Sequence, residues 1–308
     1  MNDSDIRILV LMCTHQGEMF LEPQLASIAG QTSPCQALEI HDWGSGDATP
    51  AILAEFQRRH GNSLPTRITT HALAPGPARS FLAALDQTLR SSAEFDYLMF
   101  SDQDDVWLPY KLERFREAIY REGQPDLVFS DVSLIDPEGR VIRDAMLGRS
   151  IDLHHPATLV LNLVPGMAMA VSRRLLDRWA DLWALPDWLM HDFAVCIAAY
   201  LTGATTCQIP DSLTAYRQHA GGFTTAAGGA AVLIGPFEML RRARHYVRGV
   251  HAQCDGPVET AARRLGATHL LPTLDRRTID RLIVESKSLS PKAALPYRIA
   301  FQLFSPWR

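Results

Sequence analysis

Cysteine is scarce in this 308-residue chain, and its use argues against two classes of protein. There are five cysteines, an odd number, and no two stand at Cys-x-x-Cys spacing. That usage argues against a disulfide framework and against a structural zinc site. It is typical of a protein kept in a reducing compartment, so we expect a cytoplasmic location.

Long apolar runs are missing as well. No stretch approaches the 18 apolar residues from which a transmembrane helix is predicted, so we expect no such helix. The chain starts with the acidic sequence MNDSD, and the apolar run that follows, Ile8 to Cys13, has only six residues. A signal peptide is therefore not expected either.

A strong excess of one charge is the third feature that the chain lacks. Its net charge of −4 gives no reason to expect nucleic acid as a partner. The charge is uneven, however: residues 235–308 carry 13 Lys and Arg against 6 Asp and Glu, a net of +7, which leaves −11 for the rest. Such a tail either meets an anionic surface, such as the inner face of the cell membrane, or is a solvated helical face.

Residues 290–308, SPKAALPYRIAFQLFSPWR, mix large apolar side chains with basic ones. This composition suits peripheral binding at a membrane interface. It suits equally well a C-terminal helix that packs on the core. The sequence leaves both interpretations open.

What the chain does contain is an alternation of short apolar runs with amphipathic segments. The runs predict strands at 6–13, 37–41, 66–71, 97–100 and 126–132, and the helical periodicity predicts helices at 20–29, 49–61, 78–90 and 109–123. This alternation predicts an α/β fold with a mostly parallel sheet flanked by helices. In such sheets, ligands bind beyond the carboxyl ends of the strands.

The second half of the chain has a more mixed pattern. It predicts a hairpin at 133–142, a strand at 166–171, a helix at 173–182 capped by Ser172, a buried helix at 191–202, and helices at 236–250, 257–266, 275–289 and 292–303. A Gly-rich stretch at 221–231 is interpreted as a flexible loop or linker. We therefore expect one domain over residues 1–220, and a linker with a basic helical extension over residues 221–308.

Three carboxylates crowd into the sequence SDQDDVWLPYKLE at 101–113, directly after an expected strand. Asp102, Asp104 and Asp105 repel one another unless a cation, a hydrogen-bond donor or protonation relieves them. One explanation is a divalent metal held by carboxylates and substrate phosphates. A second is a phosphatase that uses Asp102 as its nucleophile. A third is that one of the carboxylates only caps the helix opened by Pro109.

Two further considerations limit these explanations. The segment does not match an EF-hand calcium-binding loop, because Val106 and Trp107 occupy the fifth and sixth positions and the sixth requires glycine. A phosphatase of this kind needs a downstream lysine and a second acidic pair after another strand, and the chain offers no convincing set. The metal site is the explanation that the cluster favours.

Six segments of the chain, in order, resemble the family 2 glycosyltransferases. They are CTHQGEMFLEPQLASIAGQT (13–32), HDWGSGDAT (41–49), SDQDDVWLPYKLE (101–113), NLVPGMAMAVSRRLL (162–176), MHDF (190–193) and YRQH (216–219). The third closely resembles the signature of the rhamnosyltransferase-like branch, and the resemblance covers about residues 6–220. It implies the GT-A fold, which agrees with the alternation of strands and helices.

The resemblance implies a metal site for Mg²⁺ or Mn²⁺. Asp104 would bind the metal that bridges the diphosphate of a sugar nucleotide, and His219 would be a further ligand. Asp102 would contact the ribose or the shell of the metal. Breaking the sugar–phosphate bond builds negative charge on the leaving diphosphate, which a divalent cation stabilises. Without the resemblance, His219 would pass for a surface imidazole.

The resemblance also assigns the acceptor side of the reaction. Asp192 would be the general base that takes the proton of an acceptor hydroxyl in a single inverting displacement. Alternatively, its carboxylate only stabilises a helix N-terminus. His191 would line the acceptor site or orient the base. Trp107 would wall the sugar or acceptor pocket, or belong to the core.

On the donor side, Asp42 matches the residue that accepts a hydrogen bond from a pyrimidine base. Cys13 and His15 match positions beneath that base. Arg79 would meet the diphosphate, a role that suits a fixed guanidinium, or is simply an exposed helix residue. Gly166 would leave room beside the donor sugar, or mark a plain turn.

Departures from the family pattern fall mainly on the base-binding side, at His15, Gln16 and Trp43, with Ser80 and Gly222 as two more. None touches Asp104, Asp192 or His219. We therefore expect an inverting, metal-dependent glycosyltransferase. It would move a sugar, such as rhamnose from a dTDP donor, to a glycan or lipid-linked saccharide in cell-surface polysaccharide synthesis. The alternatives are the phosphatase and an inactive nucleotide- or glycan-binding module.

Overall fold

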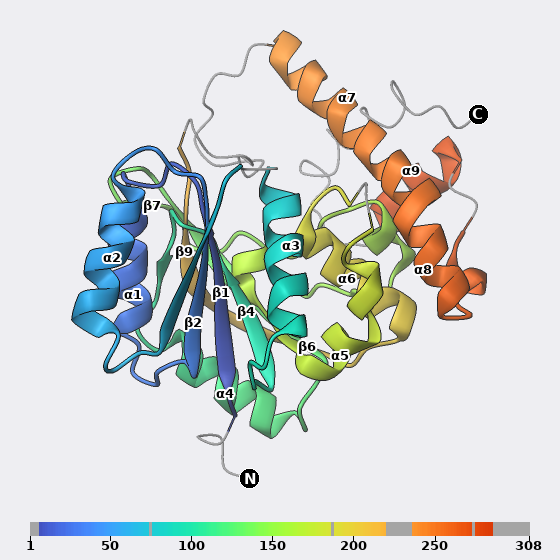
Figure 1. The fold of residues 1–308 in the computed structure, drawn as a ribbon. Coiled ribbons are helices and arrows are strands. Elements are labelled where there is room, and N and C mark those ends of the chain that lie inside the picture. The colour runs from blue at the N-terminus through green and yellow to red at the C-terminus, as the bar shows by residue number, and fades with distance from the viewer. Residues whose placement is uncertain (1–5, 74–75, 186–187, 220–235, 273–274, 286–308) are drawn as a thin grey trace.

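The computed structural model describes residues 6–73, 76–185, 188–219, 236–272 and 275–285 of the chain. A twisted sheet runs through the molecule, and helices cover both of its faces (Figure 1). Its strands are β1 (Ile8–Thr14), β2 (Ala37–Trp43), β3 (Thr66–His71), β4 (Tyr97–Ser101), β5 (Val106–Trp107), β6 (Leu127–Ile135), β7 (Val141–Arg143), β8 (Met169–Ser172) and β9 (Thr206–Arg217).

The helices match the sequence expectations closely where the apolar periodicity is strong. They are α1 (Leu21–Ala29), α2 (Thr49–His60), α3 (Pro77–Arg90), α4 (Lys111–Arg121), α5 (Arg173–Arg178), α6 (His191–Thr202), α7 (Pro236–Gln253), α8 (Glu259–Arg264) and α9 (Arg276–Glu285). Short turns of other helical types occur at η2 (Pro156–Leu159), η3 (Gly166–Ala168), η4 (Ala180–Leu182), η5 (Cys254–Val258) and η6 (Thr268–Leu270). The side chain of Ser172 caps α5 by accepting from the backbone N–H of Leu175, as expected.

The strand order in the sheet is β3-β2-β1-β4-β8-β6-β9-β5, and β7 pairs with β6. The strands β1 to β4 pair in parallel, as do β6 and β9. The strand β8 lies antiparallel between β4 and β6, so the sheet is parallel in its first half and mixed in its second. The expected α/β sheet is therefore confirmed, with this antiparallel insertion as the addition that the structure makes.

Alternate residues of the central strands enter two separate cores. In β1, Ile8 and Val10 face a core with α1, α2 and α4, whereas Leu9 and Leu11 face a core with α3, α5 and α6. All seven residues of β1 are buried, because both faces of the sheet are covered. This explains why the strand is a continuous apolar run in the sequence.

Two strands of the sheet, β5 and β9, were not expected from the sequence. The strand β9 carries Pro210 and Asp211 in its middle, and its pairing with β6 shifts register near Asp131. The strand β5 has only two residues, which form a ladder with β9. The expected hairpin, by contrast, is present: β6 and β7 are antiparallel, and Gly139 closes the turn with φ +86°.

The C-terminal helices pack on the α3 and α6 side of the sheet (Figure 1). Val247, Val258, Ile279 and Leu282 are buried in the same core as α6. The linker expected at 221–231 and the helix expected at 292–303 lie outside the described residues. Within the part of the chain that the structure describes, no helix has both the length and the apolarity needed to cross a bilayer.

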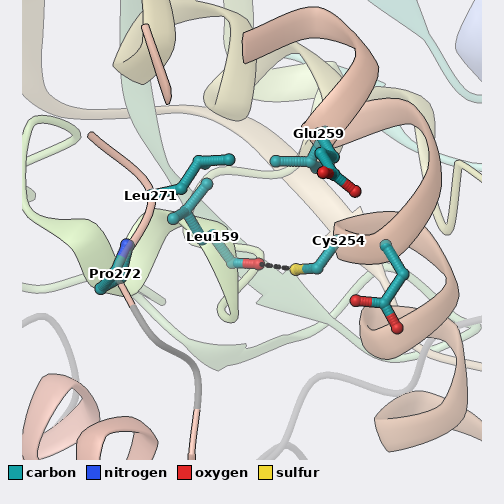
Figure 2. A pocket seen from close by; sticks show the side chains of 7 residues that line it. Leu159, Cys254, Glu259, Leu271 and Pro272 are labelled. Atoms are coloured by element: carbon teal, nitrogen blue, oxygen red, sulfur yellow. Dashed lines mark hydrogen bonds between the residues drawn. The ribbon is translucent and has the colours of Figure 1, made fainter. Parts of the chain in front are cut away.

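A cavity of about 200 Å³ lies between η2 and these C-terminal elements (Figure 2). Its lining is Leu159, Cys254, Asp255, Val258, Glu259, Leu271 and Pro272. The thiol of Cys254 contacts the carbonyl oxygen of Leu159 at 3.6 Å across it. None of the residues expected to bind substrate or metal lines this cavity, so it is separate from the site described next.

Candidate active site

Parallel pairing brings the carboxyl ends of three strands to one edge of the sheet. In register, Thr14 lies beside Asp42, and Met12 lies beside Ser101. The loops that follow β1, β2 and β4 therefore meet at this edge (Figure 1). The expected site residues from three distant segments of the sequence are gathered there.

Asp42 is held by the two loops beside it. Its carboxylate is buried and accepts from the hydroxyl of Thr14 at 2.8 Å and from the hydroxyl of Ser45 at 2.6 Å. Cys13 is buried nearby on β1, and this burial raises the pKa of its thiol. His15 is exposed, and its Nδ1 donates to the carbonyl oxygen of Trp43 at 2.8 Å. The three expected base-side residues therefore share one patch of the edge.

Asp104 and His219 meet although 115 residues separate them. The imidazole Nε2 of His219 lies 2.8 Å from Oδ2 of Asp104, and both side chains are about one-fifth exposed. The loop between β4 and β5 supplies the carboxylate, and the residues after β9 supply the imidazole. The ring of Phe20 packs against His219 with 4.9 Å between ring centroids. The two metal ligands implied by the family resemblance are thus brought together.

This pair fits a divalent cation that takes the rest of its ligands from a substrate. Among the described residues, no group of three His, Cys, Asp or Glu side chains could enclose a metal. Mg²⁺ and Mn²⁺ do not need such a cage, because phosphate oxygens and water complete their coordination. One carboxylate and one imidazole, both partly exposed, leave the open positions that a diphosphate requires.

Asp102 is the first carboxylate of the acidic cluster and is partly buried. Its burial, followed by the negative charges of Asp104 and Asp192, raises the pKa of its carboxyl to about 8. These effects place Asp102 within electrostatic reach of both the expected metal ligand and the expected base. A cation bound nearby would oppose this rise in pKa and favour the charged carboxylate.

The third carboxylate of the cluster is part of the fold. Asp105 is fully buried, and its Oδ1 accepts from the backbone N–H of Arg217 at 3.0 Å. The guanidinium of Arg217 donates in turn to the carbonyl oxygen of Asp104 at 2.8 Å. Burial, with the charges of Asp104 and Asp102, raises the pKa of Asp105. Asp105 therefore ties β9, which leads to His219, to the loop that carries Asp104.

A buried lysine lies below the cluster. The Nζ atom of Lys111 donates to the carbonyl oxygen of Met167 at 2.6 Å and to the hydroxyl of Thr214 at 2.7 Å. It also lies 3.7 Å from the centre of the Trp107 ring. The indole of Trp107 is 1% exposed and belongs to the core, which is the second of the two interpretations that the sequence allowed.

Asp192 lies in the first turn of α6 and is 5% exposed. Its Oδ1 accepts from Nδ2 of Asn162 at 3.0 Å and from the backbone N–H of Phe193 at 2.8 Å. Its Oδ2 accepts from the backbone N–H of Gly166 at 3.1 Å. A carboxylate at a helix N-terminus is also stabilised by the helix dipole. Both interpretations of Asp192 are therefore compatible with its position.

His191 and Gly166 form a close pair beside Asp192. The imidazole stacks on Phe81 with ring centroids 4.1 Å apart and meets Phe100 edge-on. A Cβ atom on Gly166 would lie 2.4 Å from Nε2 of His191, so the missing side chain makes room for this ring. Burial lowers the pKa of His191, and neither ring nitrogen has a partner among the described residues.

Known proteins resemble this chain in sequence and in fold. The model of the family "Glycosyl transferase family 2" matches residues 9–177, which is more than half of the chain. The chain belongs to glycosyltransferase family 2. The dTDP-rhamnosyl transferase RfbG of Shigella flexneri is 30% identical over 195 residues, a match that covers 59% of this chain and 64% of that relative. The chain thus spans less than two thirds of the length of this relative.

Solved structures share the fold at low sequence identity. The S. aureus TarS structure, residues 1–349 with UDP-GlcNAc, has a TM-score of 0.55 and 16% identity and covers 96% of this chain and 91% of that chain. The mannosyltransferase PcManGT from Pyrobaculum calidifontis, with GDP-Man and Mn²⁺, has a TM-score of 0.56 and 17% identity, with coverages of 100% and 89%. The expected GT-A fold, the family and the rhamnosyltransferase-like resemblance are confirmed.

In this family 2 glycosyltransferase, Trp43 replaces the second acid of the usual Asp-Asp pair. Its ring stacks on His71 at 3.8 Å with 11° between the planes. His71 is bonded to His41 through ring nitrogens 2.9 Å apart. Burial lowers the pKa of His41 to about 4, so this imidazole is neutral at neutral pH. An uncharged aromatic stack thus stands where the family pattern has a carboxylate.

Arg79 lies in the first turn of α3, at the same end of the sheet as the site. Its side chain is exposed, and it makes no ion pair with any other described residue. A guanidinium with no ion-pair partner among the described residues is suited to binding an anionic ligand. Its placement is compatible with the expected contact to a diphosphate.

Sequence reasoning missed several residues that shape the glycosyltransferase site. Gln103 makes two hydrogen bonds to the loop after β1. Its Oε1 accepts from the N–H of His15 at 2.8 Å, and its Nε2 donates to the carbonyl oxygen of His15 at 3.0 Å. A Cβ atom on Gly17 would lie 2.5 Å from Oε1 of Gln103. Asn162, Lys111 and the motif glycine at 17 were visible only as parts of the quoted segments.

Proposed function

We propose that this glycosyltransferase moves a sugar from a nucleoside diphosphate donor to a hydroxyl group with inversion at the anomeric carbon. The observation that carries the proposal is the contact between Asp104 and His219, 2.8 Å apart and both partly exposed, together with the negative charges of Asp104 and Asp192 that both act on Asp102. A site that binds a diphosphate and a carboxylate that can accept a proton are the two parts that direct displacement requires. Here the carboxylates of both parts act on the same residue, Asp102.

Each residue has a separate role in the proposed reaction. Asp192 takes the proton of the acceptor hydroxyl while that oxygen attacks the anomeric carbon. Arg79 stabilises the negative charge that develops on the leaving diphosphate. Asp104 and His219 would hold Mg²⁺ or Mn²⁺, which when bound supplies Lewis-acid stabilisation of that same charge. His191 and Gly166 shape the wall beside the base, and Trp107 supports Lys111 from the core.

We propose a dTDP-activated deoxyhexose, such as rhamnose, as the donor. The name of the Shigella flexneri relative supports this choice, as does the SDQDDVWLPYKLE segment. Asp42, with Cys13 and His15 beside it, would receive the pyrimidine, next to the uncharged stack of Trp43. The acceptor would be a glycan or lipid-linked saccharide in cell-surface polysaccharide synthesis, for example of O-antigen.

A thermal-shift panel tests the donor site. The nucleotides are dTDP, UDP and GDP, each with and without Mn²⁺. A ligand at 100 times its Kd stabilises the folded state by about 2.7 kcal/mol, which corresponds to a rise in Tm of roughly 5–10 °C for a chain of this size. We expect this rise for dTDP with Mn²⁺, a smaller one without the metal, and none for Asp104→Ala.

Asp181→Ala is the matched control, because Asp181 is exposed on η4 and its loss should leave the shift intact. The inactive-module alternative predicts the same shift but no turnover of a sugar nucleotide. A chain that no nucleotide stabilises contradicts the donor site itself. The phosphatase alternative would instead require a phosphorylated Asp102.

We further propose that residues 1–220 are the catalytic unit and that the C-terminal segment attaches the enzyme to the cytoplasmic face of a membrane. Residues 290–308 combine aromatic and basic side chains, as interfacial segments do. We expect the protein to co-sediment with vesicles of anionic lipid and less with neutral ones. The double substitution Phe304→Ser and Trp307→Ser should weaken binding at least tenfold. Equal binding to both vesicle types would contradict the proposal.

A further inference from the structure

Asn162 makes the one side-chain hydrogen bond to the Asp192 carboxylate that the described residues show. It lies in the segment between η2 and η3, and Asp192 lies 30 positions later on α6. The other two donors to this carboxylate are the backbone N–H groups of Gly166 and Phe193. A substitution can therefore remove the contact from Asn162 while the backbone contacts remain.

The orientation of the Asn162 amide follows from chemistry. An ionised carboxylate can only accept, so Asn162 must present Nδ2 to Asp192. Its Oδ1 then points away, and this buried oxygen has no hydrogen-bond partner among the described residues. A residue kept only for packing or for its own hydrogen bonds would be expected to satisfy both ends of the amide. We therefore interpret Asn162 as a hydrogen-bond donor to the carboxylate of Asp192.

The two oxygens of Asp192 differ in what they can still accept. A carboxylate oxygen has two lone pairs, and Oδ1 already receives two donors, Asn162 at 3.0 Å and Phe193 at 2.8 Å. Among the described residues, Oδ2 receives only Gly166, at 3.1 Å. Within that part of the chain, one lone pair therefore has no donor, and it belongs to Oδ2.

We propose that Asn162 is a positioning residue that occupies Oδ1 of Asp192 and leaves Oδ2 as the oxygen that takes the acceptor proton. The inference rests on the proposed function, since it needs Asp192 to be the base. It adds a residue, Asn162, and a distinction between two oxygens that the role of Asp192 alone does not contain.

Asn162→Asp gives the sharpest test, because it keeps the shape and replaces the donor with a second carboxylate. Two carboxylates at this distance share a proton, which raises the apparent pKa of the pair. The base must be deprotonated to act, so activity is lost as pH falls through its pKa. A raised pKa moves this loss to higher pH. We expect the acid limb of kcat/KM to move up by about one pH unit or more.

The assay follows release of dTDP from dTDP-rhamnose with water as the acceptor. Asn162→Ala should lower kcat about tenfold and move the limb up less than Asn162→Asp does, because it removes a donor to the carboxylate without adding a second acid, while calorimetry shows dTDP binding unchanged within twofold. This second variant also tests the idea if the aspartate variant does not fold. Asn62→Asp, on an exposed loop, is the matched control and should keep the wild-type profile.

The outcomes separate the inference from the proposed function. A wild-type profile for Asn162→Asp, or a kcat for Asn162→Ala within twofold of wild type, overturns the inference while the function stands. Equal loss of kcat and of dTDP affinity in Asn162→Ala indicates a merely structural role and overturns it as well. A wild-type protein that releases no dTDP contradicts the proposed function and the inference with it.

Discussion

Asp192→Asn is expected to lower kcat by about 100- to 10,000-fold, the usual contribution of a positioned base. The asparagine keeps the size of the side chain and one carbonyl oxygen, so it can still accept from Asn162 or Phe193. It cannot take a proton from an acceptor hydroxyl. Because Asp192 does not bind the nucleotide in the proposed mechanism, the affinity for dTDP should stay within about twofold. Steady-state kinetics with dTDP-rhamnose, together with calorimetry, measure both quantities.

Asp181→Asn is the control, since it makes the same chemical change on an exposed turn. A fall in kcat of less than tenfold for Asp192→Asn would show that another group takes the proton. Asp192 would then be what the second sequence interpretation describes, a carboxylate that stabilises the start of α6. A comparable loss of dTDP binding would instead place Asp192 on the donor side.

Lys111→Ala is expected to lower the free energy of unfolding by about 3–5 kcal/mol, because it opens a cavity in the core beside Trp107 and removes the donor of two buried acceptors. The variant leaves the carbonyl of Met167 and the hydroxyl of Thr214 without their donor. Burial lowers the pKa of the Lys111 amine, so its main role here is that of a hydrogen-bond donor in the core. Urea unfolding at neutral pH, followed by far-UV circular dichroism, measures the change.

Two variants isolate the cause of that loss. Lys111→Met keeps most of the aliphatic volume beside Trp107 and removes only the amine, so the difference from Lys111→Ala reports packing. Arg121→Ala removes a cation from the exposed end of the same helix and should change stability by less than about 0.5 kcal/mol. A Lys111→Ala protein within 1 kcal/mol of wild type would show that the buried amine is dispensable.

Local patterns in the sequence predicted those parts of the fold that local patterns determine. The continuous apolar run of β1 and the helix His191–Thr202 were both visible, because each is buried along nearly its whole length and is therefore apolar in the sequence. The strand β9 was not, since Pro210 and Asp211 interrupt its pattern and only pairing with β6 makes it a strand. Long-range pairing of this kind leaves no periodic signal.

The candidate site, too, was only partly predictable from local sequence patterns. Motifs in the sequence indicate the functional residue types at Asp104, Asp192 and His219. How these residues are arranged in space depends on the fold of the whole chain. The sequence could not show that Asp105 faces the backbone of Arg217 and not the open site. Nor could it choose between pocket and core for Trp107, because that depends on a buried lysine four positions later.

The contact between Gln103 and the loop after β1 couples positions 17 and 103, which are far apart in the sequence. Any side chain larger than hydrogen at Gly17 would push against the Gln103 amide, which stands between Asp102 and Asp104. A larger residue at position 17 would therefore displace a side chain of the acidic segment. Substitutions at 17 and 103 should therefore be found together in related sequences.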